Sequence, residues 1–79
     1  MLIRSQDKTI IVNIDNAFNI EIRDINGATA IYIGSSSSCC NMAEYSTRAK
    51  AMKVMDMIQE AYVNGHIDYQ MPADSEVVV

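Results

Sequence analysis

The segment from Ser46 to Gly65 constrains the fold most, because it is the one stretch with sustained helical periodicity. At about 100° per residue, a helix here places six apolar side chains on one face. An isolated helix of this length is marginal in water, so that face must pack against another layer. Ser46 or Thr47 is suited to cap the first turn, and Asn64-Gly65 is a typical end. The six apolar residues are Ala51, Val54, Met55, Ile58, Ala61 and Tyr62.

The residues before this helix predict the layer that it covers. Segments rich in β-branched residues alternate with polar turns and read as strands. We expect strands at 2–5, 9–14 and 18–23, and a short one at 41–45 that leads into the helix with Met42 and Glu44 on one side. The polar segment Ser5–Lys8 is compatible with a tight turn between the first two strands.

Asn26-Gly27 is the strongest hairpin signal in the chain. With these two residues in the turn, Ile22 faces Ile31 and Arg23 faces Ala30. The register then gathers isoleucines on one face of both strands, and agreement between the turn and the hydrophobic pattern favours this hairpin.

The remaining segments complete the expected order of elements. Gly34 to Cys40 is small and polar and predicts a loop, whereas His66 to Met71 alternates like a last strand that Pro72 ends. We therefore expect an α+β fold, a small antiparallel sheet of about four to six strands with one long helix packed on one face. The chain is interpreted as a single domain, 1–79, with 72–79 as a flexible tail. Its Val77–Val79 end either frays or adds a strand to a neighbouring subunit.

Composition excludes several classes of protein. A chain of 79 residues has a small stability margin, and adjacent Cys39 and Cys40 do not make a disulfide framework. With His66 as the only histidine, no zinc spacing exists, so we expect no metal and no cofactor and infer self-association into a homo-oligomer.

The net charge of −4 argues against direct nucleic-acid binding. No transmembrane run or signal peptide is recognisable, which favours a cytoplasmic protein with no membrane partner.

No hydrolase, phosphate-loop or metalloprotease motif occurs, so we expect no enzymatic activity and no catalytic residues. His66 is interpreted as a loop residue or a cation near the end of the helix. Cys39 and Cys40 are interpreted as small loop residues rather than reactive thiols.

The basic cluster Arg48, Lys50 and Lys53 is the sharpest candidate for a binding site. It stands in the first half of the helix, an order that the helix dipole disfavours. Basic side chains beside free N–H groups suit a phosphate-like anion. The alternative is a solvated basic face, neutralised by Glu44 or by carboxylates on the sheet.

A second polar, basic patch is expected at the first turn, with an ordinary exposed turn as its alternative. It consists of Arg4, Ser5, Gln6 and Lys8. Tyr45, directly before the helix, is a candidate for stacking on the ring of a ligand, as is Tyr32. Both tyrosines have packing as their alternative role.

Four short pieces of the chain resemble a group of short uncharacterised proteins from Firmicutes bacteria and their phages and prophages. The pieces are Ile3–Lys8 (IRSQDK), Glu44–Thr47 (EYST), Val54–Ile58 (VMDMI) and Gln70–Pro72 (QMP). The resemblance spans most of the chain except the loop from Gly34 to Cys40, and it brings no biochemical activity with it. It implies a phage-borne accessory protein that counters host defence.

Three functions follow as hypotheses. The first is an oligomeric binding module that sequesters an anionic signal such as a cyclic nucleotide or an ADP-ribose-type molecule. The second is an inhibitor that binds a host defence protein through acidic residues of the sheet. The third is a small structural subunit without a ligand. The acidic residues considered for the second are Asp7, Asp15, Glu21, Asp24 and Asp68.

Overall fold

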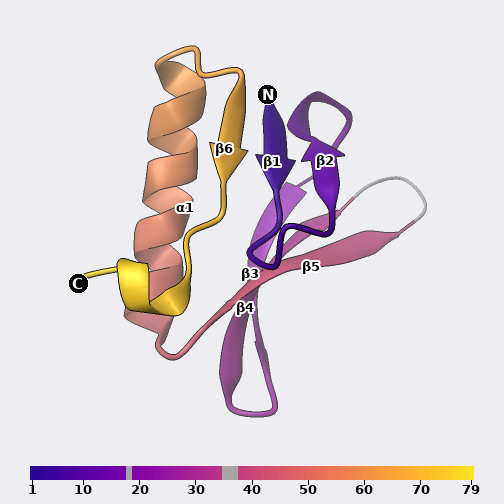
Figure 1. Cartoon of the computed structure of the whole chain (residues 1–79). Helices are drawn as coiled ribbons and strands as arrows, with labels where there is room; N and C mark the ends of the chain where they lie inside the picture. Colours follow the sequence, from indigo (N-terminus) through magenta and orange to yellow (C-terminus); the bar gives the residue numbers. More distant parts are fainter. Residues whose placement is uncertain (18, 35–37) are drawn as a thin grey trace.

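The computed structural model describes residues 1–17, 19–34 and 38–79. The chain is α+β, and these residues form one α-helix and two three-stranded sheets, as Figure 1 shows. The first sheet has the strand order β2-β1-β6 and the second the order β3-β4-β5. The strands are β1 (Leu2–Arg4), β2 (Ile11–Asn13), β3 (Asn19–Ile25), β4 (Ala28–Gly34), β5 (Cys39–Tyr45) and β6 (Asp68–Gln70). Helix α1 spans Arg48–Val63, and the 3-10 helices η1 and η2 span Ile14–Asn16 and Asp74–Glu76.

The β3–β4 hairpin has the predicted register. Ile22 pairs with Ile31 and Arg23 with Ala30. Asn26 and Gly27 in the turn have positive φ angles of 51° and 82°, the left-handed conformation that a type I′ hairpin turn needs at both positions. Residue 18, where the third strand was expected to begin, lies outside the described residues.

Strand β5 is longer than predicted and contains both cysteines. Cys39 pairs with Gly34 and Cys40 with Ile33, so these positions belong to strands and not to the predicted loop. Residues 35–37 of that loop lie outside the described residues. The small and polar residues of this segment did not indicate a strand. The start of β5 forms through its pairing with β4, and its own residues do not predict that pairing.

A β-bulge changes which side chains of β5 are buried. Ile31 pairs with Ala43 and Tyr32 with Asn41, which leaves Met42 as the extra residue. Met42 and Ala43 are therefore both buried, although they are neighbours in a strand. The expectation that Met42 shares a side with exposed Glu44 was wrong, because the bulge shifts the alternation between them.

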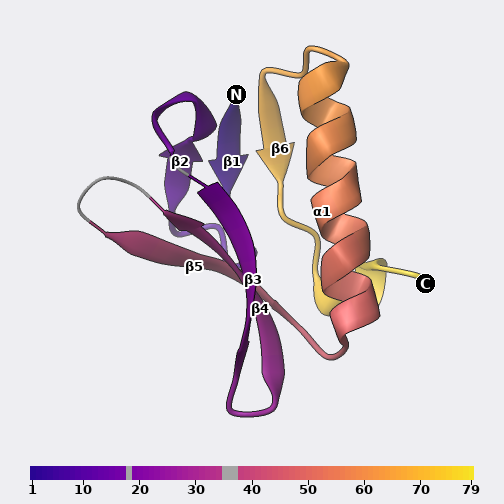
Figure 2. The ribbon, with the colours of Figure 1, turned by 180° about the vertical axis from the view of Figure 1, so that it is seen from behind.

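The first sheet joins the two ends of the chain. Ile3 of β1 pairs with Val12 of antiparallel β2 and with Tyr69 of parallel β6. We expected one antiparallel sheet, and the structure differs in having two sheets and one parallel pair. Figures 1 and 2 show β6 descending beside α1 to reach β1 from the other end of the chain. Strand periodicity carries no information about such a distant partner.

Helix α1 has the predicted ends. The Thr47 hydroxyl accepts a hydrogen bond from the Lys50 backbone N–H at 3.2 Å, and Gly65 has a φ of 77° just beyond the last turn. Four of the six predicted apolar positions are buried, Met55 is half-buried, and Tyr62 is exposed. The buried face is thus narrower than predicted. No helix among the described residues has the length and apolar character needed to cross a membrane.

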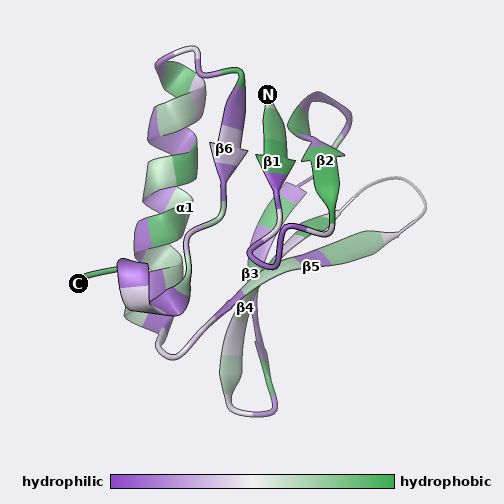
Figure 3. Cartoon of the chain, in the orientation of Figure 1, coloured by the Kyte–Doolittle hydropathy of each residue, from purple (hydrophilic) through white to green (hydrophobic). Residues whose placement is uncertain are grey.

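The hydrophobic core lies between α1 and the two sheets. Ile31 from β4 and Tyr45 from β5 meet Val54 and Ile58 from the helix, with Ile3 from β1 completing the cluster. Figure 3 shows hydrophobic positions in both sheets and along the helix. The core therefore draws on both sheets, and each depends on the helix for burial.

The segment expected as a tail is docked on the fold. Met71 and Val77 are buried in the core cluster, and η2 between them lies against the start of α1 (Figure 1). Val78 and Val79 remain exposed. Within the segment 72–79, Val77 reaches the core, and this contact with distant residues could not be read from the segment itself.

Candidate functional site

The basic cluster at the start of α1 makes ion pairs within the chain. Arg48 Nη1 lies 3.1 Å from Asp24 Oδ2 of β3, and both side chains are largely exposed. Lys50 Nζ lies 3.3 Å from Asp74 Oδ2 and donates to the Asp74 backbone oxygen at 3.0 Å. Two of the three cations are thus neutralised: Asp24 is a carboxylate on the sheet, as the alternative interpretation expected, whereas Asp74 belongs to η2 and was not part of it. Lys53 is exposed and has no hydrogen-bond or ion-pair partner in the part of the chain that the structure describes.

The turn between β1 and β2 uses its polar groups internally. Ser5 is buried, accepts from the Ile10 backbone N–H and donates to Asp7. Arg4 Nε donates to the Lys8 backbone oxygen at 3.1 Å. Lys8 itself has a φ of 68°. Ser5 is therefore part of the turn, and the expectation that its hydroxyl is available to a ligand is not met.

Gln6 and Tyr45 hold the docked C-terminal segment. The Gln6 side-chain nitrogen donates to the backbone oxygens of Glu44 and Pro72, and its oxygen accepts from the Glu44 backbone N–H, all at 3.1 Å. The buried Tyr45 hydroxyl donates to the Pro72 oxygen at 2.8 Å. Burial is the main cause that raises the pKa of Tyr45. Both side chains are structural in this arrangement, since their polar atoms are already bonded.

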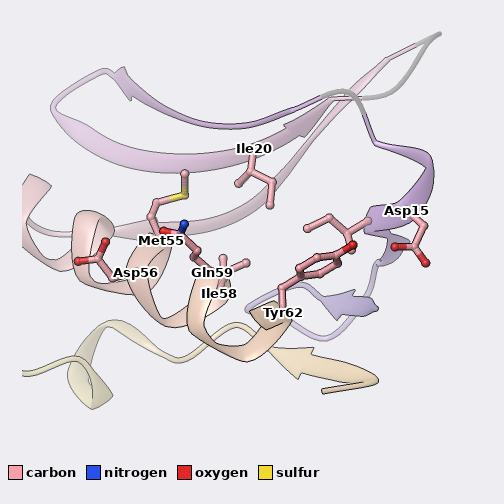
Figure 4. A pocket seen from close by; sticks show the side chains of 8 residues that line it. Asp15, Ile20, Met55, Asp56, Ile58, Gln59 and Tyr62 are labelled. Carbon is pink, nitrogen blue, oxygen red and sulfur yellow. The ribbon is translucent and has the colours of Figure 1, made fainter. Parts of the chain in front are cut away.

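An open groove of about 560 Å³ separates one side of α1 from β3 and η1. Figure 4 shows the Met55 and Ile20 side chains directed toward each other across it. Ile14 and Ile58 supply further apolar surface. The polar lining residues are Asp15, Asp56, Gln59 and Tyr62.

The charged side chains of the groove are acidic. Asp56 lies toward one end in Figure 4, and Asp15 lies with Tyr62 toward the other. No Lys, Arg or His is among the described residues that line it. Asp15 pairs with the N-terminal ammonium at 3.4 Å, and Asp56 has no ion-pair partner among the residues described. The groove suits an apolar group that carries positive charge.

The exposed stripe of the helix extends this apolar surface. Met52, Tyr62 and Val63 are 47, 56 and 76% exposed. At about 100° per residue these side chains and Met55 fall within one sector of the helix. Gln59 lies in the same sector, so the exposed apolar side chains are interrupted by one polar residue. Exposed apolar side chains gathered on one side of a small protein are typical of an interaction site.

The sequence indicated part of this exposed apolar surface. Met52 and Val63 lie outside the predicted core face, and nothing in helical packing explains them. The groove itself was missed because Ile14 and Ile20 belong to η1 and β3, and only the tertiary structure places them opposite the helix.

The other candidate side chains are not brought together. His66 is exposed in the turn after α1, and Cys39 is exposed on β5 with its sulfur 3.5 Å from Arg23 Nη1. The Arg23 guanidinium also lies 4.6 Å from the centre of the Tyr32 ring, so Tyr32 has a packing role. No cluster of three metal-binding side chains occurs among the residues described.

Comparison with protein-family models, with curated proteins and with solved structures found no match to this chain.

Proposed function

We propose that this chain is a protein-binding module whose groove between α1 and β3 receives an apolar segment of a partner protein that also carries Lys or Arg. One observation carries the proposal: the groove has an apolar floor, and the charged side chains that line it are Asp15 and Asp56. Aliphatic side chains of the partner would cover Met55 and Ile58, and its basic residue would meet Asp56.

The form of the surface supports a protein segment as the occupant. The groove runs along α1, and the exposed Met52 and Val63 extend its apolar character along the helix. An amphipathic helix laid into an apolar groove is a common mode of peptide recognition. Methionine is suited to it, because its unbranched side chain adapts to the partner's surface.

The charge of the groove favours a basic protein segment over a nucleotide as its occupant. A nucleotide phosphate there would approach Asp15 and Asp56, and like charges disfavour that encounter. A basic segment gains chiefly from Asp56, because Asp15 already pairs with the N-terminal ammonium. The resemblance to phage and prophage proteins supports a host defence protein as the source of that segment.

A synthetic amphipathic peptide of leucine and lysine tests the proposal, with a leucine and glutamate peptide of the same pattern as its counterpart. Titration calorimetry measures the affinity, and NMR shift changes at Met55, Ile58 and Tyr62 locate the site. We expect the basic peptide to bind at least about tenfold more tightly than the acidic one. Equal affinities, or shift changes that avoid the groove, overturn the proposal.

A matched pair of charge reversals sharpens the test. Asp56 lines the groove, whereas Glu60 is exposed one turn further along α1 and does not line it. Asp56→Lys is expected to weaken binding of the basic peptide by about fivefold or more, and Glu60→Lys by less than about twofold. Equal losses mean that net charge alone attracts the peptide, which contradicts the proposed site.

Sequestration of an anionic nucleotide-like signal is the second proposal. Lys53, exposed and without a partner among the described residues, favours it. An anion at the helix start would have to displace Asp74 from Lys50. Titration with cyclic nucleotides and ADP-ribose tests it: binding that Lys53→Gln abolishes supports it, and no heat at about millimolar ligand refutes it.

A further inference from the structure

The first sheet has one face that no other described element covers. Along each of its three strands the inward residue is buried or half-buried, and both outward residues are exposed. The pairing aligns Ile3 with Val12 and Tyr69 on the inward side. We name the six outward residues the β1 face: Leu2, Arg4, Ile11, Asn13, Asp68 and Gln70.

The β1 face has an apolar centre. Leu2 and Ile11 are 46 and 57% exposed and lie diagonally on neighbouring strands. A shallow cleft of about 420 Å³ includes both of these side chains together with Arg4 and Asp68. Figure 3 shows β1 and β2 as strongly hydrophobic strands. Such side chains on a strand face are normally covered by another layer.

The charges of the β1 face are complementary to those of a second copy. The face holds one cation, Arg4, and one anion, Asp68, so it is neutral although the chain carries −4. These two side chains belong to neighbouring strands yet make no ion pair with each other. Asp68 has no ion-pair partner among the described residues, and the hydrogen bond from Arg4 to the Lys8 backbone oxygen uses Nε alone. A two-fold axis through the face would bring Arg4 of each copy to Asp68 of the other.

We propose that the β1 face is the contact between two copies of this chain, related by a two-fold axis. Leu2 packs near the axis between two symmetry-related Arg4–Asp68 pairs, and Ile11 of β2 packs on the outer side of these pairs. Six side chains make a contact at or below the lower limit of specific interfaces, so we expect a dissociation constant of about 10 µM or weaker. The groove beside α1 is not part of this contact, so the dimer and the partner protein are independent proposals.

Two charge reversals, mixed together, test the pairing. Arg4→Glu alone places two acids at each contact, and Asp68→Lys alone places two cations there. Each variant is expected to weaken its own dimer by about tenfold or more. In a mixture of the two, both contacts of the mixed dimer are again of opposite charge. Sedimentation velocity over about 10 µM to 1 mM should therefore show dimer returning in the mixture and not in either variant alone.

The controls separate this contact from folding and from net charge. Lys53→Glu and Glu60→Lys carry the same charge changes on exposed positions of α1, and both should dimerise like the unmodified chain. Ile11→Glu places a charge in the apolar part of the contact and is expected to abolish the dimer while the circular dichroism spectrum is unchanged. If Arg4→Glu unfolds the chain, Ile11→Glu and Asp68→Lys still decide the question.

Three results overturn the proposal. The first is an unmodified chain that stays monomeric at about 1 mM. The second is a dimer that survives Ile11→Glu. The third is a mixture of the two charge reversals that dimerises no better than its components.

Discussion

Asp74 accepts hydrogen bonds from both the backbone N–H and the hydroxyl of Ser46, at 2.8 and 3.0 Å. A carboxylate from near the end of the chain thus occupies the start of α1, beside Lys50. The backbone hydrogen bond from Ser46 is the main cause that lowers the pKa of Asp74. The basic end of the helix therefore has a structural role, since it holds η2 in place.

Removing this carboxylate should destabilise the fold. Asp74→Ala leaves the Ser46 N–H without its acceptor and leaves Lys50 Nζ with the Asp74 backbone oxygen alone, so η2 is held less firmly to the helix. We expect the urea midpoint of unfolding to fall. Ser75→Ala, at an exposed neighbouring position with no side-chain partner among the residues described, is the control. Equal midpoints for the two variants would contradict this role.

Gln6 is expected to matter more for stability than any other exposed or half-buried glutamine. Gln6→Ala removes three hydrogen bonds, takes these partners from the Glu44 backbone N–H and oxygen, and leaves the Pro72 oxygen with the Tyr45 hydroxyl alone. The expected loss in the free energy of unfolding is about 1–3 kcal/mol, measured by urea denaturation. Gln59→Ala, on the exposed side of α1, should change it by less than about 0.5 kcal/mol. If Gln6→Ala lowers the free energy of unfolding as little as Gln59→Ala does, the hydrogen bonds of Gln6 do not stabilise the fold.

Stability should fall in acid through Asp7. Hydrogen bonds from the Thr9 hydroxyl, the Ser5 hydroxyl and the Thr9 N–H lower the pKa of Asp7 from 3.8 to about 2. Because the folded state favours the charged form, this contribution is complete above pH of about 4 and is lost as the pH falls toward 2. Urea midpoints measured across this range should decline less steeply for Asp7→Asn. Parallel curves for the two proteins would contradict the assignment.

The two ion pairs of the helix start should differ in their effect on stability. Arg48 and Asp24 are 60 and 64% exposed, so Arg48→Gln should change the free energy of unfolding by less than about 0.5 kcal/mol. Lys50 is more buried and also donates to the Asp74 backbone oxygen. Lys50→Gln is therefore expected to lower the thermal midpoint by more than Arg48→Gln does. The reverse order would show that η2 does not depend on Lys50.

The candidate site was only partly predictable. The apolar positions Met55, Ile58 and Tyr62 follow from helical spacing, and the spacing also marks Met52 and Val63 as unexplained. Their function as one side of a groove depends on Ile14 and Ile20, which reach the helix only in the folded chain. The opposite holds for Arg48 and Lys50. In sequence they look like unpaired cations, because their partners Asp24 and Asp74 are each 24 residues away.

The sequence alone determined the turns and helix ends, which depend on neighbouring residues. Asn26-Gly27 accepts positive φ angles, so the β3–β4 register followed, and Thr47 with Gly65 defined the ends of α1. Tertiary structure decided the division into two sheets, the parallel β1–β6 pair and the docking of Val77. The physical reason is the range of the interactions. Turn and cap preferences depend on a few neighbouring residues. Strand pairing and burial depend on contacts between distant segments, and the arrangement of lowest free energy is a property of the whole chain.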